Sequence, residues 1–155
     1  MPEHAERRRV RHAPDDVFDL VADVRDYPRF IKWIRAMRVI EENAVDGVGT
    51  LTAEAMVGYK LLRERFTTRV TLDRLNGAID VAFVAGPFSA LENRWRFRPL
   101  ADGSTEVDFH VCVELTNPLL RAILAANFDR AAERIMNAFE ARAAERFPLV
   151  GAETA

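Results

Sequence analysis

The sequence of 155 residues contains one cysteine, Cys112. A single cysteine excludes an intramolecular disulfide and a cysteine-based zinc cluster, and it favours a reducing compartment. Long apolar runs are also missing: no stretch approaches the roughly 18 uncharged apolar residues of a membrane-spanning helix, and the start, MPEHAERRRV, lacks the apolar segment of a signal peptide. We therefore expect a cytoplasmic protein, which could still visit the inner face of a membrane peripherally.

A large excess of charge of one sign is absent, because the formal net charge is only −2. We therefore expect no DNA partner. The exception is local: ERRRVRH, residues 6–12, brings together Arg7, Arg8, Arg9 and Arg11. Such a run could contact anionic lipid or RNA, although charge runs are more often simply solvated, and both interpretations stay open.

Catalytic and cofactor motifs are missing as well. The seven glycines never form G-x-G-x-x-G or G-x-x-x-x-G-K-[ST], so no nucleotide cofactor is predicted. His4, His12 and His110 are predicted to be solvated surface residues. Cys112 would share one strand face with His110, which makes only a weak case for a surface metal or redox site. We expect no catalytic residue, no metal ion and no required cofactor.

The residues that are present predict one globular domain over residues 1–155, with 49% apolar and 30% charged residues. Residues 4–12 suggest a charged edge strand. In APDDVFDLVADV, Pro14 and the acids after it suit the first turn of a short helix. Its apolar residues recur on one face: Val17, Phe18, Val21 and Val24. Asp26 as a cap, with Pro28 in the first turn, predicts a second short helix over residues 27–33.

From residue 34 to residue 115 the apolar period changes to two. It predicts six antiparallel strands, over residues 37–42, 50–59, 66–75, 78–84, 91–99 and 104–115. In RWRFRP, Trp95 and Phe97 alternate with arginines, so their rings should point inward. Asn117 as N-cap and Pro118 at the first position then predict a helix of about thirty residues that ends before Pro148.

This order predicts an α+β fold. We expect a curved antiparallel sheet of about seven strands wrapped around the long C-terminal helix, with two short helices after the first strand. Because a curved sheet and one long helix enclose a wedge rather than a flat layer, we also expect a cavity between them.

Three stretches carry a family resemblance: VFDLVADVRDYPRFIKWI, GPFSALENRWRFRPLADGSTEVDFHV and FDRAAERIMNAFEARA. In this order they cover most of the chain and resemble the START-like helix-grip superfamily (SRPBCC), in its branch of coenzyme Q-binding, polyketide cyclase and lipid-transport proteins. The family's first motif commonly has proline where Lys32 stands and cysteine where Ile34 stands. Neither change should disturb the fold, although each could alter the loop.

The resemblance implies a protein that binds a hydrophobic small molecule between sheet and helix. Its first candidate ligand is ubiquinone or a related polyprenyl lipid, held by a non-enzymatic carrier that supports respiration. Very similar bacterial sequences are described as ribosome-association toxins, and the branch includes cyclases. A ribosome-directed interaction protein and a cyclase-type enzyme therefore stay open as alternatives, and transient contact with a membrane surface is a further expectation.

The predicted ligand-binding residues are rings on the expected inner faces and apolar residues of the long helix, with the head group near the first three. They are Tyr27, Phe30, Trp33, Phe83, Trp95, Phe97, Phe109, Leu124, Phe128 and Ile135. Taken singly, each ring is more often a core residue, and it is the architecture that favours a ligand. A cyclase would also need polar groups inside, for which the candidates are Tyr59, Thr68, Arg63 and Glu64.

The front half of the long helix, PLLRAILAANF, carries Arg121 as its only charge. An exposed helix of this composition would present an apolar patch suited to a pocket mouth, a membrane surface or a partner protein. Packing against the two short helices would explain the composition equally well.

Overall fold

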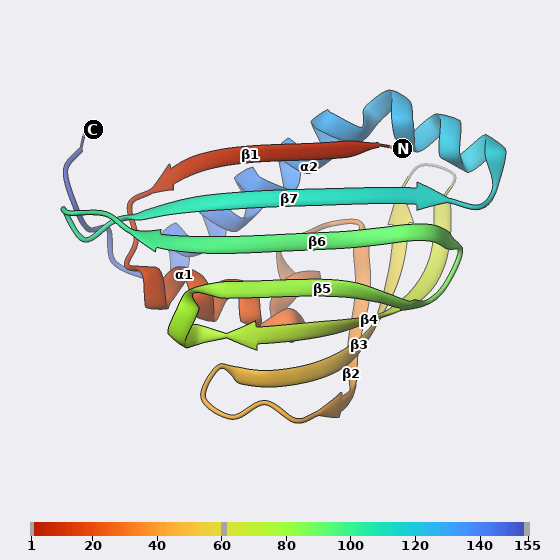
Figure 1. Ribbon diagram of the computed structural model, residues 1–155. Coiled ribbons are helices and arrows are strands. Elements are labelled where there is room, and N and C mark those ends of the chain that lie inside the picture. The colour runs from red at the N-terminus through yellow and green to blue at the C-terminus, as the bar shows by residue number, and fades with distance from the viewer. Residues whose placement is uncertain (1, 60–61, 154–155) are drawn as a thin grey trace.

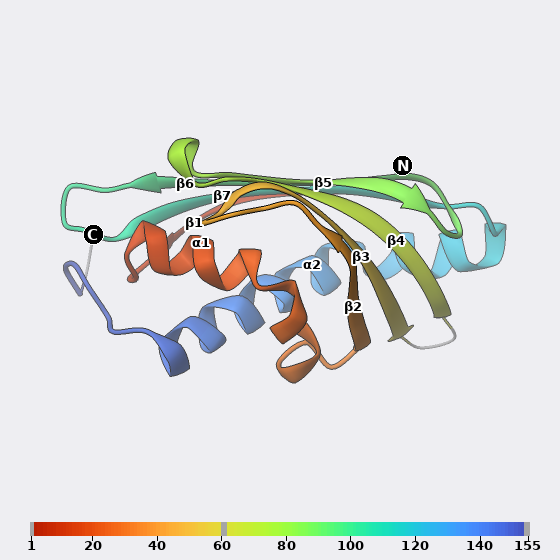
Figure 2. The same cartoon turned by 90° about the horizontal axis from the view of Figure 1, so that it is seen from below.

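The computed structural model describes residues 2–59 and 62–153. Its seven strands form one sheet in the order β1-β7-β6-β5-β4-β3-β2, and neighbouring strands are antiparallel. The sheet curves over the long helix α2 (Pro118–Arg146), and α1 (Pro14–Ala22) and η1 (Val24–Arg29) cover the same face (Figures 1 and 2). The predicted α+β helix-grip fold is confirmed.

The remaining elements follow the chain between η1 and α2, apart from the first strand. They are β1 (Glu3–Val10), β2 (Ile34–Glu42), β3 (Val48–Tyr59), β4 (Leu62–Asp73), η2 (Arg74–Asn76), β5 (Ala78–Ala85), β6 (Phe88–Pro99) and β7 (Thr105–Leu115). Both β2 and β6 begin three residues before the predicted start, so Phe88, which the prediction leaves between two strands, belongs to the sheet.

The predicted end of the fourth strand at Leu75 was wrong, because the chain turns at Asp73 instead. The Asp73 carboxylate accepts a hydrogen bond from the backbone N–H of Asn76, 3.2 Å away, and closes the short helix η2. Gly77 then adopts the left-handed conformation, with φ of 59°. A Cβ there would lie 2.5 Å from the carbonyl oxygen of Phe97, so the turn requires glycine.

The second short helix also differs from its prediction. It is a 3-10 helix from Val24 to Arg29, and Pro28 lies inside it rather than in the first turn of a helix over residues 27–33. Asp26 does not cap it: its carboxylate is buried and paired with Arg142 of α2, 2.9 Å away. Tertiary ion pairing therefore overrides the local capping role that the sequence suggested.

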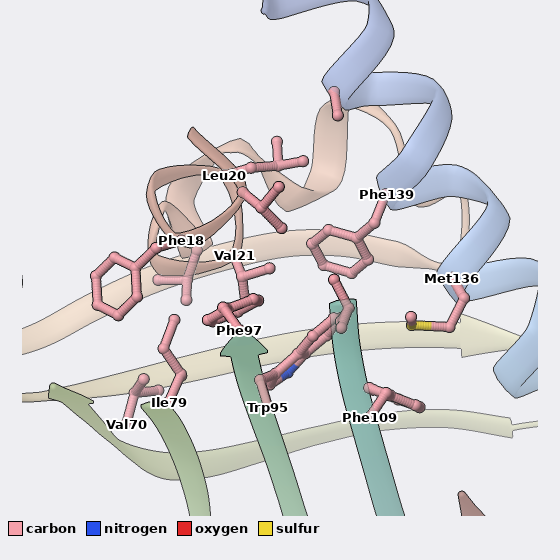
Figure 3. Close-up of a cluster of buried hydrophobic side chains, with 14 of the residues drawn as sticks. Phe18, Leu20, Val21, Val70, Ile79, Trp95, Phe97, Phe109, Met136 and Phe139 are labelled. Carbon is pink, nitrogen blue, oxygen red and sulfur yellow. The ribbon is translucent and has the colours of Figure 1, made fainter. Parts of the chain in front are cut away.

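The long helix begins as predicted. The Asn117 side chain accepts hydrogen bonds from the backbone N–H groups of Leu119 and Leu120 at 2.9 and 3.2 Å, and Pro118 occupies the first turn. The core lies between the second half of α2, the segment α1–η1 and the sheet. Figure 3 shows Met136 and Phe139 of α2 directed toward Trp95 and Phe109, with the Trp95 and Phe139 rings 5.0 Å apart. Val21 and Val24 are buried in this core, as predicted.

The arginines in and just after the first strand form ion pairs and hydrogen bonds within the molecule, so this strand is not a solvated edge. Arg7 pairs with Asp108 at 2.8 Å, Arg8 with Glu140 at 3.1 Å, and Arg9 with Asp102 at 2.6 Å. Arg11 donates to the carbonyl oxygen of Gly151. The basic run therefore ties β1 to β7, to α2 and to the C-terminal segment, and much of its charge is neutralised within the molecule.

Two of the predicted surface histidines are buried, and that prediction was wrong. His4 lies beneath α2, where its ring nitrogens contact Glu6 at 3.0 Å and Asp129 at 2.9 Å. His12 is 2% exposed, and its Nδ1 contacts the carbonyl oxygen of Pro148. Both are covered because α2 and the chain that follows it cross the β1 edge. His110 is half-buried beside Glu3.

Candidate functional site

A cavity of about 290 Å³ lies between the concave face of the sheet and α2, and it is partly open to solvent. Its walls come from η1 and the loop after it, from β2 to β7, and from α2. They are apolar almost throughout, and no aspartate, glutamate, histidine, lysine or arginine of the described residues contributes to them. This chemistry suits a hydrophobic molecule and offers no charge to neutralise an ionic one.

Seven of the ten residues predicted from the sequence line this cavity. They are Tyr27, Trp33, Trp95, Phe109, Leu124, Phe128 and Ile135. The structure therefore gathers residues from η1, β6, β7 and α2 around one space, and their contact with a ligand stays a prediction.

Phe30, Phe83 and Phe97 do not line the cavity. The Phe30 ring packs edge-on against Phe139, 5.1 Å away, so it stands behind the wall. Phe83 packs edge-on against Phe88, which does form part of the wall. Phe97 belongs to the core under α1, where its ring meets Phe18 at 5.9 Å. Alternation identified the inner face of the strands, but it could not tell core from cavity wall.

The inner end of the cavity is closed by Tyr27. Its hydroxyl donates to the carbonyl oxygen of Val21, and its ring packs edge-on against Phe139 at 5.2 Å. Burial, with the nearby charge of Asp23 adding to it, raises the pKa of the Tyr27 phenol above its usual range. The phenol therefore stays neutral, and its oxygen keeps one lone pair that could accept a hydrogen bond.

The segment that carries Tyr27 is pinned to α2 by Asp26. Arg142 donates two hydrogen bonds to its carboxylate, at 2.9 and 3.0 Å, and Arg146 adds a third at 3.3 Å. These bonds outweigh the cost of burial and lower the pKa of the Asp26 carboxyl. The Arg142 guanidinium also lies 5.8 Å from the centre of the Phe30 ring. Asp26 therefore fixes the position of this end wall.

Two polar side chains interrupt the apolar wall of the sheet. Thr68 of β4 is buried and lines the cavity. Asn93 of β6 accepts a hydrogen bond from the Trp95 indole at 2.8 Å and donates one to the carbonyl oxygen of His110 at 2.9 Å. Thr68 was a sequence candidate, but Asn93 was missed. It stands two residues before Trp95, so the same alternation places it on the inner face.

The other polar candidates for a cyclase lie elsewhere. Arg63 is exposed, Glu64 is half-buried, and neither lines the cavity. The side chain of Tyr59 lies outside the described residues. No group of histidine, cysteine and acidic residues within the described part of the chain could hold a metal ion, so His110 and Cys112 form no such site.

We infer that the cavity opens between the first half of α2 and the strands that curve away from it. The lining residues Val57, Phe66, Phe88 and Leu124 are only half-buried, whereas Ile79 at the core end is 1% exposed. The helix packs mainly against β1, β7 and α1. Figures 1 and 2 place α1 beside the second half of α2, so the front half does not pack on this short helix, and Leu119 is 65% exposed.

Comparison with known proteins agrees with this architecture. A family model described as polyketide cyclase/dehydrase and lipid transport matches residues 10–140. The ribosome association toxin RatA of Rickettsia prowazekii is 34% identical over 137 residues, which cover 86% of this chain and 90% of the toxin. The mitochondrial coenzyme Q-binding protein COQ10 homolog B of Xenopus laevis is 27% identical over 144 residues, which cover 91% of this chain and 57% of that protein.

Among solved structures, the 18 kDa protein CC1736 of Caulobacter crescentus superposes with a TM-score of 0.77 at 43% sequence identity. The match covers 94% of this chain and 97% of that one. None of the described helices is long and apolar enough to cross a membrane. The chain therefore belongs to the polyketide cyclase/dehydrase and lipid transport family, and it has the hydrophobic-ligand-binding, START-like helix-grip fold of that family.

Proposed function

We propose that the protein is a non-enzymatic carrier that binds ubiquinone or a related polyprenyl lipid in this cavity. The observation that carries the proposal is the cavity itself, which is uncharged, almost wholly apolar and built from both sheet and helix. Burial of prenyl carbons contributes about 0.8 kcal/mol per methylene-sized group, so affinity requires little polar chemistry. The coenzyme Q-binding relative supports this choice of ligand.

The size of the cavity suggests how such a lipid would lie. At about 290 Å³ it is at the lower end of the range of ligand pockets, about 300–1,000 Å³. It suits a head group and the first part of a tail, while the rest of a long tail would leave through the mouth beside α2. We place the head group near Tyr27 and Trp33. Thr68 and Asn93 then offer polar contacts along the wall of the sheet.

Tryptophan fluorescence gives a direct test, because both tryptophans of the chain, Trp33 and Trp95, line the cavity. Titration with a short-tailed ubiquinone should quench their emission in a saturable way. Ala131→Phe, which adds a ring to the cavity wall, should weaken binding at least tenfold. Ala144→Phe adds the same ring to an exposed position of the same helix and should leave affinity unchanged.

Native purification followed by mass spectrometry of organic extracts is the complementary measurement. We expect ubiquinone or a related lipid in extracts of the wild type and much less in those of Ala131→Phe. Protein that retains no quinone or lipid, and shows no saturable quenching when offered one, contradicts the carrier proposal.

A ribosome-directed function is the second candidate, and the relatives named RatA are the observation that favours it. The N-terminal arginines are poor subjects for its test, because Arg7, Arg8 and Arg9 already pair with acids and their reversal would disturb the fold. Cosedimentation of the wild-type protein with ribosomal subunits at low salt is expected for this candidate. Its absence at low salt, where phosphate contacts are strongest, contradicts it.

The cyclase alternative has less support from the site. Acid–base catalysis needs a group that changes protonation near neutral pH within reach of the substrate. Among the described lining residues only Tyr27 is ionisable on its side chain, and its pKa is raised above the usual range.

A further inference from the structure

Many cations of the molecular surface are neutralised by acids within the molecule. Those of the N-terminal run have partners in β7, α2 and the C-terminal segment. In contrast, Arg35, Arg63 and Arg65 are exposed, and none of them has a carboxylate within 4.0 Å among the described residues. Lys32, Arg69, Arg130 and Arg134 are likewise exposed without such a partner among the described residues, so unneutralised positive charge lies outside the N-terminal run.

These three arginines come together across three neighbouring strands. In the β3–β4 register Arg63 faces Gly58 and Arg65 faces Met56. The Arg35 side chain lies over Gly58, with its Nε 3.2 Å from the position of a Cβ at that residue. Paired residues of neighbouring strands share one face of a sheet. Arg35, Arg63 and Arg65 thus form one cationic cluster, here called the rim patch, on the outer face of the strands that border the mouth.

Exposed apolar side chains lie beside and opposite the rim patch. Met56, whose sulfur is 3.6 Å from an Arg65 nitrogen, is 40% exposed. Leu119 in the first turn of α2 is 65% exposed, and α2 carries no acidic residue before Asp129. Figures 1 and 2 both place the start of α2 and the adjoining ends of β3 and β4 at the same end of the molecule. This end is therefore both cationic and apolar.

We propose that this end of the molecule docks on the surface of a bilayer that contains anionic lipid. The rim patch lies against the phosphate groups, and Leu119 enters the boundary between head groups and acyl chains. Docking in this orientation places the cavity mouth against the bilayer. The purpose of the contact rests on the proposed carrier function, because a hydrophobic ligand could then enter the cavity without crossing water.

An RNA surface would satisfy the arginines but offers nothing to Leu119 and Met56. The combination of unpaired cations with exposed apolar side chains around a hydrophobic mouth therefore favours a lipid surface over a nucleic acid.

Flotation with vesicles tests the proposal. The wild-type protein should bind vesicles of phosphatidylcholine mixed equally with phosphatidylglycerol, and bind vesicles of phosphatidylcholine alone far less. Each basic residue near an anionic surface is worth about fivefold in partitioning, so Arg63→Gln with Arg65→Gln should lower binding about 25-fold. Equal binding to both kinds of vesicle, or undiminished binding of the double variant, overturns the proposal.

Arg69→Gln is the matched control. Arg69 is exposed on the same outer face of β4 and also has no carboxylate partner among the described residues, but it stands four residues beyond Arg65. That spacing is about 13 Å along a strand, and charges separated by more than about 10 Å are largely screened at moderate salt. Binding of Arg69→Gln to the anionic vesicles should therefore stay within about twofold of wild-type binding.

Leu119→Glu separates a bilayer from a polyanion. An acid in the first turn of a helix is favoured by the helix dipole, so this variant should fold. It should lose binding to the anionic vesicles. A different result would overturn the proposal in favour of a nucleic-acid partner. In that case binding would still need Arg63 and Arg65, would be unaffected by Leu119→Glu, and would be equally strong to single-stranded RNA.

The docking proposal and the carrier proposal fail separately. Ala131→Phe should still float with anionic vesicles although it no longer binds quinone. The arginine double variant should still bind a short-tailed quinone supplied in solution. Loss of quinone binding in that variant would place the arginines in the ligand site and contradict their assignment to the docking surface.

Discussion

Asp26 shows how one buried carboxylate determines the end wall of the cavity. It is 6% exposed and accepts hydrogen bonds from Arg142 and Arg146, so it joins η1 to the last turns of α2. Because Tyr27 follows it directly, the same contact positions the aromatic closure of the cavity. A substitution at Asp26 therefore acts on both stability and ligand binding.

Asp26→Asn should lower the free energy of unfolding by about 2 kcal/mol at neutral pH, since two arginines lose a charged acceptor. Folding lowers the pKa of this carboxyl. Its contribution is therefore complete above the pKa of an unfolded aspartate, about 3.9, and is lost as the pH falls through the folded-state value. Urea unfolding of wild type and variant from neutral pH to about pH 3 measures this difference.

Asp23→Asn is the control for this measurement. Asp23 stands three residues earlier and lies 3.6 Å from Arg146, but its side chain is 43% exposed. Asp23→Asn should lower the free energy of unfolding by less than about 0.5 kcal/mol. If the two variants lose equal stability, burial of Asp26 is not what makes its ion pair strong.

His4 is a second residue whose protonation affects the fold. Burial alone would lower its pKa, but the hydrogen bonds to Glu6 and Asp129 outweigh burial and raise it. A raised pKa means that protonated His4 stabilises the folded state fully below about pH 6.5, and that this contribution is lost as the pH rises through the folded-state value.

The difference in unfolding free energy between wild type and His4→Gln should therefore be largest in mildly acidic solution and shrink as the solution becomes alkaline. Unfolding over a pH series measures it, and NMR titration of the His4 ring reports the pKa directly. Asp129→Asn removes one of the two partners and should lower that pKa. A difference that grows with pH contradicts this account.

At the scale of elements, the two halves of α2 have different environments. The second half is packed, with Met136, Phe139 and Ala143 buried in the core. The first half lies over the cavity, where Leu124 is half-buried and Leu119 exposed. The first half therefore depends more on its N-cap than on packing.

Asn117→Ala should lower the free energy of unfolding by about 1 kcal/mol, because two backbone N–H groups lose their acceptor. The loss should be local, so amide exchange should accelerate in residues 118–124 and change little in the second half of α2. Hydrogen exchange resolved by residue measures this. Leu119→Ala, in the same turn but without a capping role, is the control, and faster exchange along the whole helix would contradict a local effect.

At the scale of the whole molecule, a ligand in the cavity should join the sheet to the first half of α2. A short-tailed ubiquinone at a hundredfold excess over its dissociation constant should raise the unfolding free energy by about 2.7 kcal/mol. It should also slow amide exchange in residues 118–128. At the same ligand concentration Ala131→Phe should gain no more than about 1.4 kcal/mol, because at least tenfold weaker binding leaves at most a tenfold excess. Equal stabilisation of that variant would place the ligand outside this cavity.

Much of the fold was predictable from local chemistry. The first α-helix begins at Pro14, which acids follow, and the second begins after the side-chain cap of Asn117. Period-two alternation identified Trp95, Phe109 and their neighbours as inward-facing. These signals are carried by residues close together in the chain, so a single sequence contains them. The same alternation also places Asn93 on the inner face of β6.

The sequence by itself determined which residues are apolar, which face of each strand points inward, and where the helices begin. Only the tertiary structure decided which inward rings line a cavity, which histidines are buried, and which arginines keep a free charge. The physical reason is distance along the chain. Arg7 meets Asp108, Asp26 meets Arg142, and Arg35 joins Arg63 and Arg65 only after the strands pair and α2 crosses the sheet. Burial and neutralisation depend on such long-range partners, which local patterns do not encode.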